Sequence, residues 1–186
     1  MNLNRRGMLF VLVAIALTGA PASRAHAASA AKINKEVNAA LKKLYASNPT
    51  AKLLGENAKA VLVFPSIWKA GFIVGAQGGN GALRKGGKTV GYYNSAAASY
   101  GLQAGAQGFG YAMFLMTDSA VAHLEQSAGW EIGVGPSVVI IDKGIATSLT
   151  TETMKDDVYA IIFDQKGLMA GIGIQGSKIT KIHPGK

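Results

Sequence analysis

The sequence contains no cysteine. Disulfide bonds, thiolate metal sites, a cysteine nucleophile and a lipid-modified N-terminal cysteine are therefore all excluded. Histidines (three) and acidic residues (ten) are also few, which leaves little material for metal binding or acid–base chemistry. The fold must be stabilised by burial of apolar side chains, which a chain of this length can achieve within one domain.

Long apolar runs are scarce as well, and the longest one lies near the N-terminus. Met8–Leu17 is apolar throughout, follows Arg5 and Arg6, and precedes Ala25–Ala27, which has the A-x-A form of a cleavage site. This order is typical of a secretory signal peptide, and the run is too short to span a bilayer. The paired arginines also fit a twin-arginine signal, so both export routes remain open.

Cleavage there would divide the chain into a signal, residues 1–27, and one mature domain, residues 28–186. Three of the 19 basic residues leave with the signal, so 16 basic residues remain against ten acidic ones. This excess favours anionic partners, and for an exported chain a membrane surface or a glycan is favoured over nucleic acid. We therefore expect a periplasmic or secreted protein that associates peripherally with a membrane.

Two helices are predicted after the signal. Ala31–Ala46 carries apolar side chains on one face at helical spacing and lysines on the opposite face. The apolar set is Ile33, Val37, Ala40, Leu41 and Leu44, and the basic set is Lys32, Lys35, Lys42 and Lys43. Pro49 ends this helix, because proline cannot continue the hydrogen-bond ladder, and Thr50 is suited to cap a second helix over residues 51–60.

From residue 60 onward, short apolar runs punctuated by glycine predict strands. The predicted strands are residues 60–65, ended by Pro65, then 69–77, 88–94 and a hairpin formed by 158–163 and 168–174. One helix interrupts them over residues 119–128, capped by Thr117 or Asp118. The expected fold class is α+β, with two N-terminal helices packed on an antiparallel, partly barrel-like, glycine-rich β-sheet and one inserted helix.

The motif G-x-Q-G occurs three times, at Gly75–Gly78, Gly105–Gly108 and Gly173–Gly176. Glycine weakens a strand unless backbone must pass close or bend sharply. The three copies therefore predict tight corners or close strand crossings, with a ligand groove lined by these glycines as the alternative.

Residues 82–89, ALRKGGKT, differ by one letter from the phosphate-binding loop G-x-x-x-x-G-K-[ST], and Val138–Asp142 resembles the strand that accompanies such a loop. A phosphate loop must be followed by a helix, whose first N–H groups hold the anion. Here the residues that follow favour a strand, and Gly86-Gly87 favours a two-residue hairpin turn. We therefore expect no nucleotide.

The sequence gives equally little support for a catalytic site or a metal site. His26 leaves with the signal, His123 lies in a predicted helix and His183 in the tail, without a cluster of carboxylates beside them. The nucleophile motif G-x-S-x-G is absent. A catalytic pair of carboxylates that come together only in the folded chain, as in glycoside hydrolysis, remains open, although nothing in the sequence favours one. We expect a non-enzymatic protein with no metal and no cofactor.

The basic helix has two interpretations. In the first, it packs its apolar face on the sheet and exposes its lysines to water. In the second, it lies in a membrane interface, where each lysine near anionic headgroups contributes about 1 kcal/mol. Lysines opposite the apolar stripe point away from a bilayer, so headgroup contact requires a docked helix with its basic side outward.

Two further features lie in the strand region. Arg84, Lys85 and Lys88 surround the predicted glycine turn. Trp68-Lys69 is an aromatic–basic pair of the kind found at interfaces, although a core tryptophan beside a surface lysine is equally common. The candidate lipid-binding residues are Lys32, Lys35, Lys42, Lys43, Arg84, Lys85 and Lys88.

Four blocks of the sequence resemble the SYLF domain family. They are FPSIWKAGFIVGAQGGNG (64–81), YGLQAGAQGFG (100–110), GVGP (133–136) and GLMAGIGIQGSKI (167–179), with the helix TDSAVAHL between the second and third. The resemblance extends over roughly residues 32–182. It implies a non-enzymatic module that binds anionic lipid partly through an N-terminal amphipathic segment, here the Ala31–Ala46 helix, and it implies that the glycine blocks are structural.

These observations converge on an exported protein that binds anionic phospholipids or membrane surfaces through its basic N-terminal helix. Phosphatidylglycerol, cardiolipin or another anionic envelope lipid fits an exported chain better than the phosphoinositides bound by eukaryotic members. The alternative is a structural or protein-interaction domain of the envelope, in monomeric or oligomeric form, with no role in lipid binding.

Overall fold

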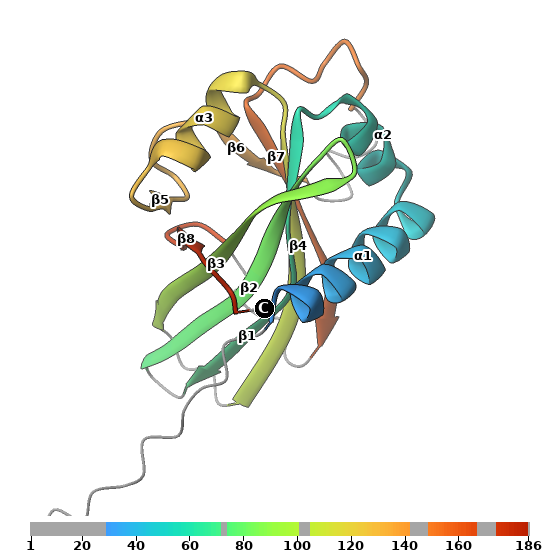
Figure 1. Cartoon of the computed structure of the whole chain (residues 1–186). Helices are drawn as coiled ribbons and strands as arrows, with labels where there is room; N and C mark the ends of the chain where they lie inside the picture. The colour runs from blue at the N-terminus through green and yellow to red at the C-terminus, as the bar shows by residue number, and fades with distance from the viewer. Residues whose placement is uncertain (1–28, 72–73, 101–104, 142–148, 167–173, 186) are drawn as a thin grey trace, which may run out of the picture.

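The computed structural model describes residues 29–71, 74–100, 105–141, 149–166 and 174–185 (Figure 1). The expected signal, residues 1–27, lies outside these ranges. In the described part three helices accompany eight strands. The helices are α1 (Ala30–Ser47), α2 (Pro49–Asn57) and α3 (Asp118–Gln126). None of the described helices is long and apolar enough to cross a membrane.

The two N-terminal helices meet at a single residue. Asn48 ends α1, and its side-chain Oδ1 accepts a hydrogen bond from the Ala51 N–H at 2.9 Å, which caps α2. Pro49 then occupies the first turn of α2, where its missing N–H would have no partner in the helix anyway. The sequence prediction of Thr50 as the cap was therefore wrong by two residues.

The strands of the described ranges form one curled, half-barrel sheet. They are β1 (Ala60–Gly71), β2 (Val74–Lys85), β3 (Lys88–Tyr100), β4 (Gly105–Leu115), β5 (Trp130–Glu131), β6 (Val138–Ile140), β7 (Val158–Lys166) and β8 (Lys178–Ile182). Their order across the sheet is β5-β8-β3-β2-β1-β4-β7-β6. The predicted α+β class is confirmed, but the sheet is mixed, because the short β6 pairs with β7 in parallel.

Pro65 does not end the first strand as predicted. Instead β1 continues to Gly71, and its register against β4 shifts between Phe64 and Ile67. Proline cannot donate to a ladder, so a bulge is one of the few places in a sheet that accept it. The strand therefore bends at Pro65, and the residues beyond it remain paired with both neighbours.

Two glycines beside this bulge, Gly79 and Gly81, permit a close approach of backbones, although both lie outside the G-x-Q-G copies. A Cβ at Gly79 would lie 2.2 Å from the Ser66 carbonyl oxygen, and one at Gly81 would lie 2.2 Å from that of Val63. Gly86 and Gly87 have φ values of 55° and 77°, as a two-residue type I′ turn requires. The predicted hairpin turn is confirmed, and it joins β2 to β3.

The second predicted hairpin fares differently. β7 runs through the expected turn to Lys166 and pairs with β4, and Asp164 within it has a φ of 51°. Most of the proposed second strand, residues 168–173, lies outside the described residues.

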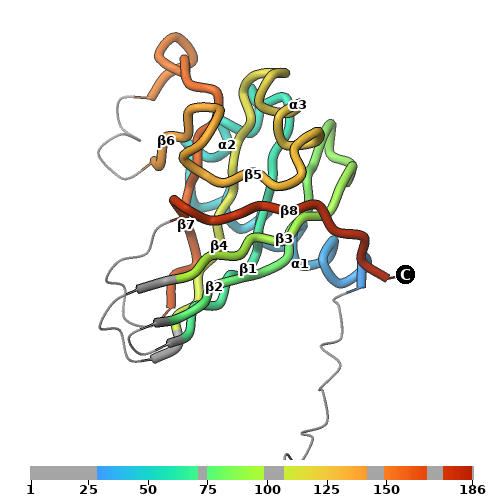
Figure 2. Tube along the Cα trace, turned by 90° about the vertical axis from the view of Figure 1, so that its left-hand side faces the viewer, coloured from blue at the N-terminus to red at the C-terminus, as the bar shows by residue number. Residues whose placement is uncertain are grey.

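Hydrophobic cores lie on both faces of the sheet. On the inner face, α3 and the region around Trp130 cover Phe64, Tyr111 and neighbouring side chains. On the outer face, α1 and α2 cover Val61, Val63 and their neighbours. Figure 1 shows α3 and β5 on one side of the strands and α1 and α2 on the other, and Figure 2 looks onto the side that carries α3 and β5. The candidate site lies on this outer face, on and beside α1.

Candidate functional site

The apolar face of α1 is buried against the sheet. Ile33, Val37 and Leu44 are at most 4% exposed, in one cluster with Val63 and Phe114 of the strands. The first interpretation of this helix, a surface helix packed on the sheet, is therefore confirmed. With α1 docked, these side chains cannot enter the acyl region of a bilayer.

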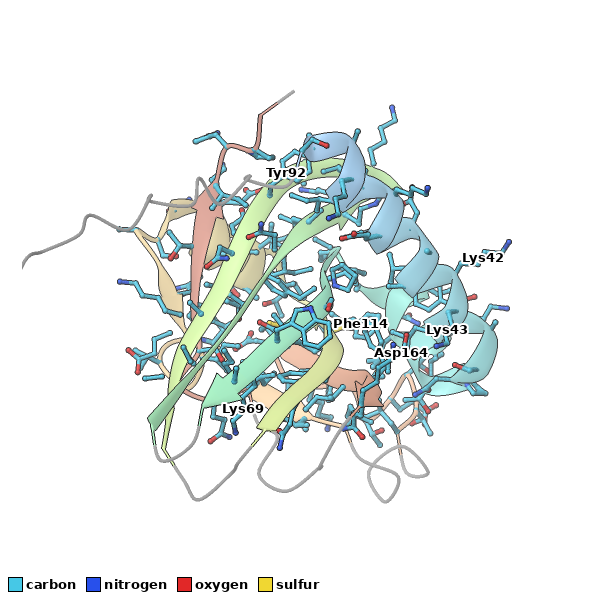
Figure 3. All side chains as sticks on the ribbon, turned by 90° about the horizontal axis from the view of Figure 1, so that it is seen from below. Lys42, Lys43, Lys69, Tyr92, Phe114 and Asp164 are labelled. Carbon is cyan, nitrogen blue, oxygen red and sulfur yellow. The ribbon has the colours of Figure 1, made fainter. Side chains whose placement is uncertain are left out.

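The four lysines of α1 divide into two pairs. Lys32 and Lys43 lie on one flank of the helix, and Lys35 and Lys42 are exposed on its outer side. Figure 3 shows Lys42 pointing away from the molecule, whereas Lys43 lies beside Asp164. The predicted single basic face is therefore too simple, because only part of the set lies opposite the apolar stripe.

The flank lysines already have carboxylate partners. The Lys43 ammonium lies 2.5 Å from Asp164 Oδ1, and that of Lys32 lies 3.9 Å from Glu36. Both pairs are well exposed, so each contributes little to stability, about 0.2–1 kcal/mol. Their consequence is electrostatic, since each lysine is neutralised by its own neighbour.

The basic hairpin also divides. The guanidinium of Arg84 donates to Thr89 Oγ1 at 2.7 Å and to the carbonyl of Gly87, so it braces the turn. Lys85 and Lys88 face each other across the hairpin and are exposed. Arg84 is thus a structural residue of the hairpin, and the two lysines form its tip.

A chain of hydrogen bonds attaches this hairpin to α1. Thr89 Oγ1 donates to Asn34 Oδ1 at 2.7 Å, and Asn34 Nδ2 donates to the Tyr92 hydroxyl at 2.8 Å. The hairpin base and the helix therefore form one continuous surface. Four exposed lysines on this surface have no carboxylate within 4.0 Å in the described part of the chain. They are Lys35, Lys42, Lys85 and Lys88, and we name them the basic ridge.

A groove of about 520 Å³ runs along the other flank of α1. We name it the Trp68 groove. Its walls come from α1, β1, β2 and β7, and its lining includes Lys32, Glu36, Lys43, Trp68, Asn80 and Asp164. Sequence analysis left open whether Trp68 is a core or an interface residue. The structure excludes a core position, because Trp68 is 61% exposed.

Sequence reasoning missed the acidic and amide members of this groove. Glu36, Asn80 and Asp164 are far apart in the chain and share no local pattern. Asp164 carried one weak signal, since aspartate is among the few residues that adopt a positive φ.

The described residues contain no cluster of three or more histidine, aspartate or glutamate side chains that could hold a metal ion. His123 packs edge-on against Trp130, with ring centroids 5.7 Å apart. The Val138–Asp142 motif begins as the edge strand β6, and Asp142 itself lies outside the described residues. Burial raises the pKa of Tyr45, Tyr93 and Tyr111, as expected of phenols kept neutral in a core.

A protein-family model named Ysc84, described as Las17-binding protein actin regulator, matches residues 96–183. This segment contains the second, third and fourth of the blocks that resemble the SYLF family. The match over residues 96–183 agrees with the resemblance of the sequence to the SYLF family. Comparison with curated proteins returns no match.

The matched segment spans the sheet from the second half of β3 to β8, including α3. The basic ridge and most of the Trp68 groove lie N-terminal to it. The family match therefore supports a lipid- or actin-related binding domain, and it does not extend to the basic ridge.

Proposed function

We propose that this chain is an exported, non-enzymatic protein that binds anionic lipid surfaces, such as envelope membranes rich in phosphatidylglycerol or cardiolipin. The basic ridge supplies the contact. The observation that carries the proposal is the exposure of four lysines, on α1 and the hairpin tip, that have no carboxylate partner in the described part of the chain.

The mode of binding follows from what α1 has already buried. Its apolar stripe is covered by the sheet, so attraction to headgroups must supply most of the binding energy. Each lysine near an anionic surface contributes about 1 kcal/mol, and the attraction falls off within a Debye length, about 8 Å at physiological salt. The protein would thus lie on the membrane rather than in it.

The seven candidate contacts predicted from the sequence differ in how much free positive charge each offers to a lipid headgroup. Lys35, Lys42, Lys85 and Lys88 are the principal contacts. Lys32 and Lys43 are secondary, because Glu36 and Asp164 offset their charges. Arg84 positions the tip through Thr89 and Gly87.

Co-sedimentation with vesicles of defined composition tests this proposal. The mature chain is expected to bind vesicles that contain phosphatidylglycerol, to bind phosphatidylcholine vesicles at least tenfold more weakly, and to lose its preference as salt is raised. Equal binding to both vesicle types at low salt would contradict the proposal. If that result accompanied a stable oligomer in light scattering, the alternative of an envelope structural domain would replace it.

A further inference from the structure

The Trp68 groove is not explained by binding to a charged surface. It lies on the flank of α1 opposite the hairpin, and its charges cancel within it. Lys32 is balanced by Glu36 at 3.9 Å and Lys43 by Asp164 at 2.5 Å. A ligand for this groove therefore gains nothing from net charge and must be recognised by shape and hydrogen bonds.

The floor of the groove is the indole ring of Trp68, which packs against Gly108. Trp68 pairs in register with Gly78 on one side and Gly108 on the other. A Cβ at Gly108 would lie 3.4 Å from Cζ3 of the indole, an ordinary contact distance, so the ring lies directly over this glycine. The ring thus rests against β4, and 61% of the Trp68 side chain remains exposed.

Neutral and charged hydrogen-bonding groups surround this floor. Asn80 Oδ1 accepts a hydrogen bond from Asn94 Nδ2 at 2.8 Å. This bond orients the Asn80 side-chain amide, whose N–H groups are donors. Lys43 engages Oδ1 of Asp164, which leaves the second carboxylate oxygen as an acceptor. Asp164 has a φ of 51° there, a backbone conformation that aspartate adopts more readily than most non-glycine residues.

We propose that the Trp68 groove binds a neutral saccharide, a short oligosaccharide of pyranose rings. The apolar C–H face of a pyranose packs on the electron-rich face of the indole, and its hydroxyls at the ring edge meet the carboxylate and the amide. A groove of about 520 Å³ has the size of a small-molecule site and suits a short oligosaccharide.

Tryptophan fluorescence is the direct probe, using N,N′-diacetylchitobiose and cellobiose as ligands. Trp130 is buried and donates its indole N–H to the Val134 carbonyl, so a ligand-dependent change reports on Trp68. We expect a saturable change with a dissociation constant below about 10 mM for at least one disaccharide. Trp68→Ala should weaken binding at least tenfold, and Trp68→Phe should retain part of it.

A matched control uses another exposed apolar residue. Val134 is 62% exposed on a different part of the surface, so Val134→Ala should leave saccharide binding unchanged. The proposal is overturned by the absence of saturable binding to both disaccharides, or by undiminished binding in Trp68→Ala, measured by calorimetry.

The same variants separate this site from the membrane surface. Trp68→Ala should bind anionic vesicles like the wild type, because the basic ridge is intact. Loss of vesicle binding in Trp68→Ala, or saturation of Trp68 fluorescence by dihexanoylphosphatidylglycerol and not by a disaccharide, would assign the groove to a lipid headgroup and overturn the saccharide proposal. Failure of vesicle binding by the wild type would leave the saccharide titration unaffected.

Discussion

Individual residues of this protein are used in ways that their chemistry alone does not reveal. Tyr93 is an example: it lies on β3, is 1% exposed and packs in the inner core. Burial, assisted by the carboxylate of Glu125, raises its pKa from 10.0 to about 12. The neutral phenol is therefore the form that the folded state holds.

This shift in pKa predicts how stability depends on pH. The unfolded chain releases the Tyr93 proton near pH 10, whereas the folded chain keeps it to about pH 12. The free energy of unfolding gained from this residue is complete below pH ~10 and decreases as pH rises toward ~12. Tyr93→Phe should make the decline shallower, by up to about 1.4 kcal/mol per pH unit.

Urea denaturation of both proteins at several pH values between ~9 and ~12 measures this difference. If the two proteins lose stability in parallel over this range, Tyr93 does not titrate as the structure requires.

At the scale of elements, the glycine hairpin and the helices were the most predictable parts. Gly86-Gly87 defines its own turn, because few residues other than glycine adopt two successive positive φ values. The period of apolar residues in α1 likewise predicted its buried face. Such features are encoded within a few residues, so they could be found without knowledge of the rest of the chain.

The elements that sequence reasoning misjudged depend on distant partners. Pro65 is accepted within β1 because both neighbouring strands shift register around it. The parallel pairing of β6 depends on β7, some twenty residues later in the chain. The Trp68 groove joins residue 36 to residue 164. No local pattern encodes these meetings, although the exposed Trp68 itself was noticed as a candidate.

The hairpin turn offers a test at this scale. Gly87 has a φ of 77° and open space around it, so Gly87→Ala creates no clash and only strains the backbone. We expect a loss of about 1–2 kcal/mol in the free energy of unfolding.

Gly185→Ala is the matched control, because that glycine is also open but lacks a positive φ. Its effect should stay within about 0.5 kcal/mol in the same chemical denaturation experiment. Equal effects of the two substitutions would show that turn conformation is not what makes Gly87 necessary.

At the scale of the whole molecule, the sheet separates two kinds of surface. The inner face is closed by α3 and its neighbours, whereas the outer face presents α1 as a ridge between the hairpin and the Trp68 groove (Figures 1 and 2). The N–H of Ala30, at the start of α1, bonds to the Gly185 carbonyl at 3.1 Å, so the two ends of the described chain meet beside this ridge. Unbalanced positive charge thus lies on the outer side of the helix and at the hairpin tip, whereas the charges on the groove flank are balanced.

The most direct test of the account compares two double variants on anionic vesicles. Lys35→Glu with Lys42→Glu alters the basic ridge, and Lys155→Glu with Lys178→Glu makes the same change in net charge at exposed lysines on the 149–157 segment and β8. Co-sedimentation with phosphatidylglycerol vesicles should show at least tenfold weaker binding for the ridge variant, because two contacts of about 1 kcal/mol each are replaced by repulsion. The control should bind within about threefold of the wild type. Equal weakening of both variants, or no weakening of either, would contradict a membrane site on α1.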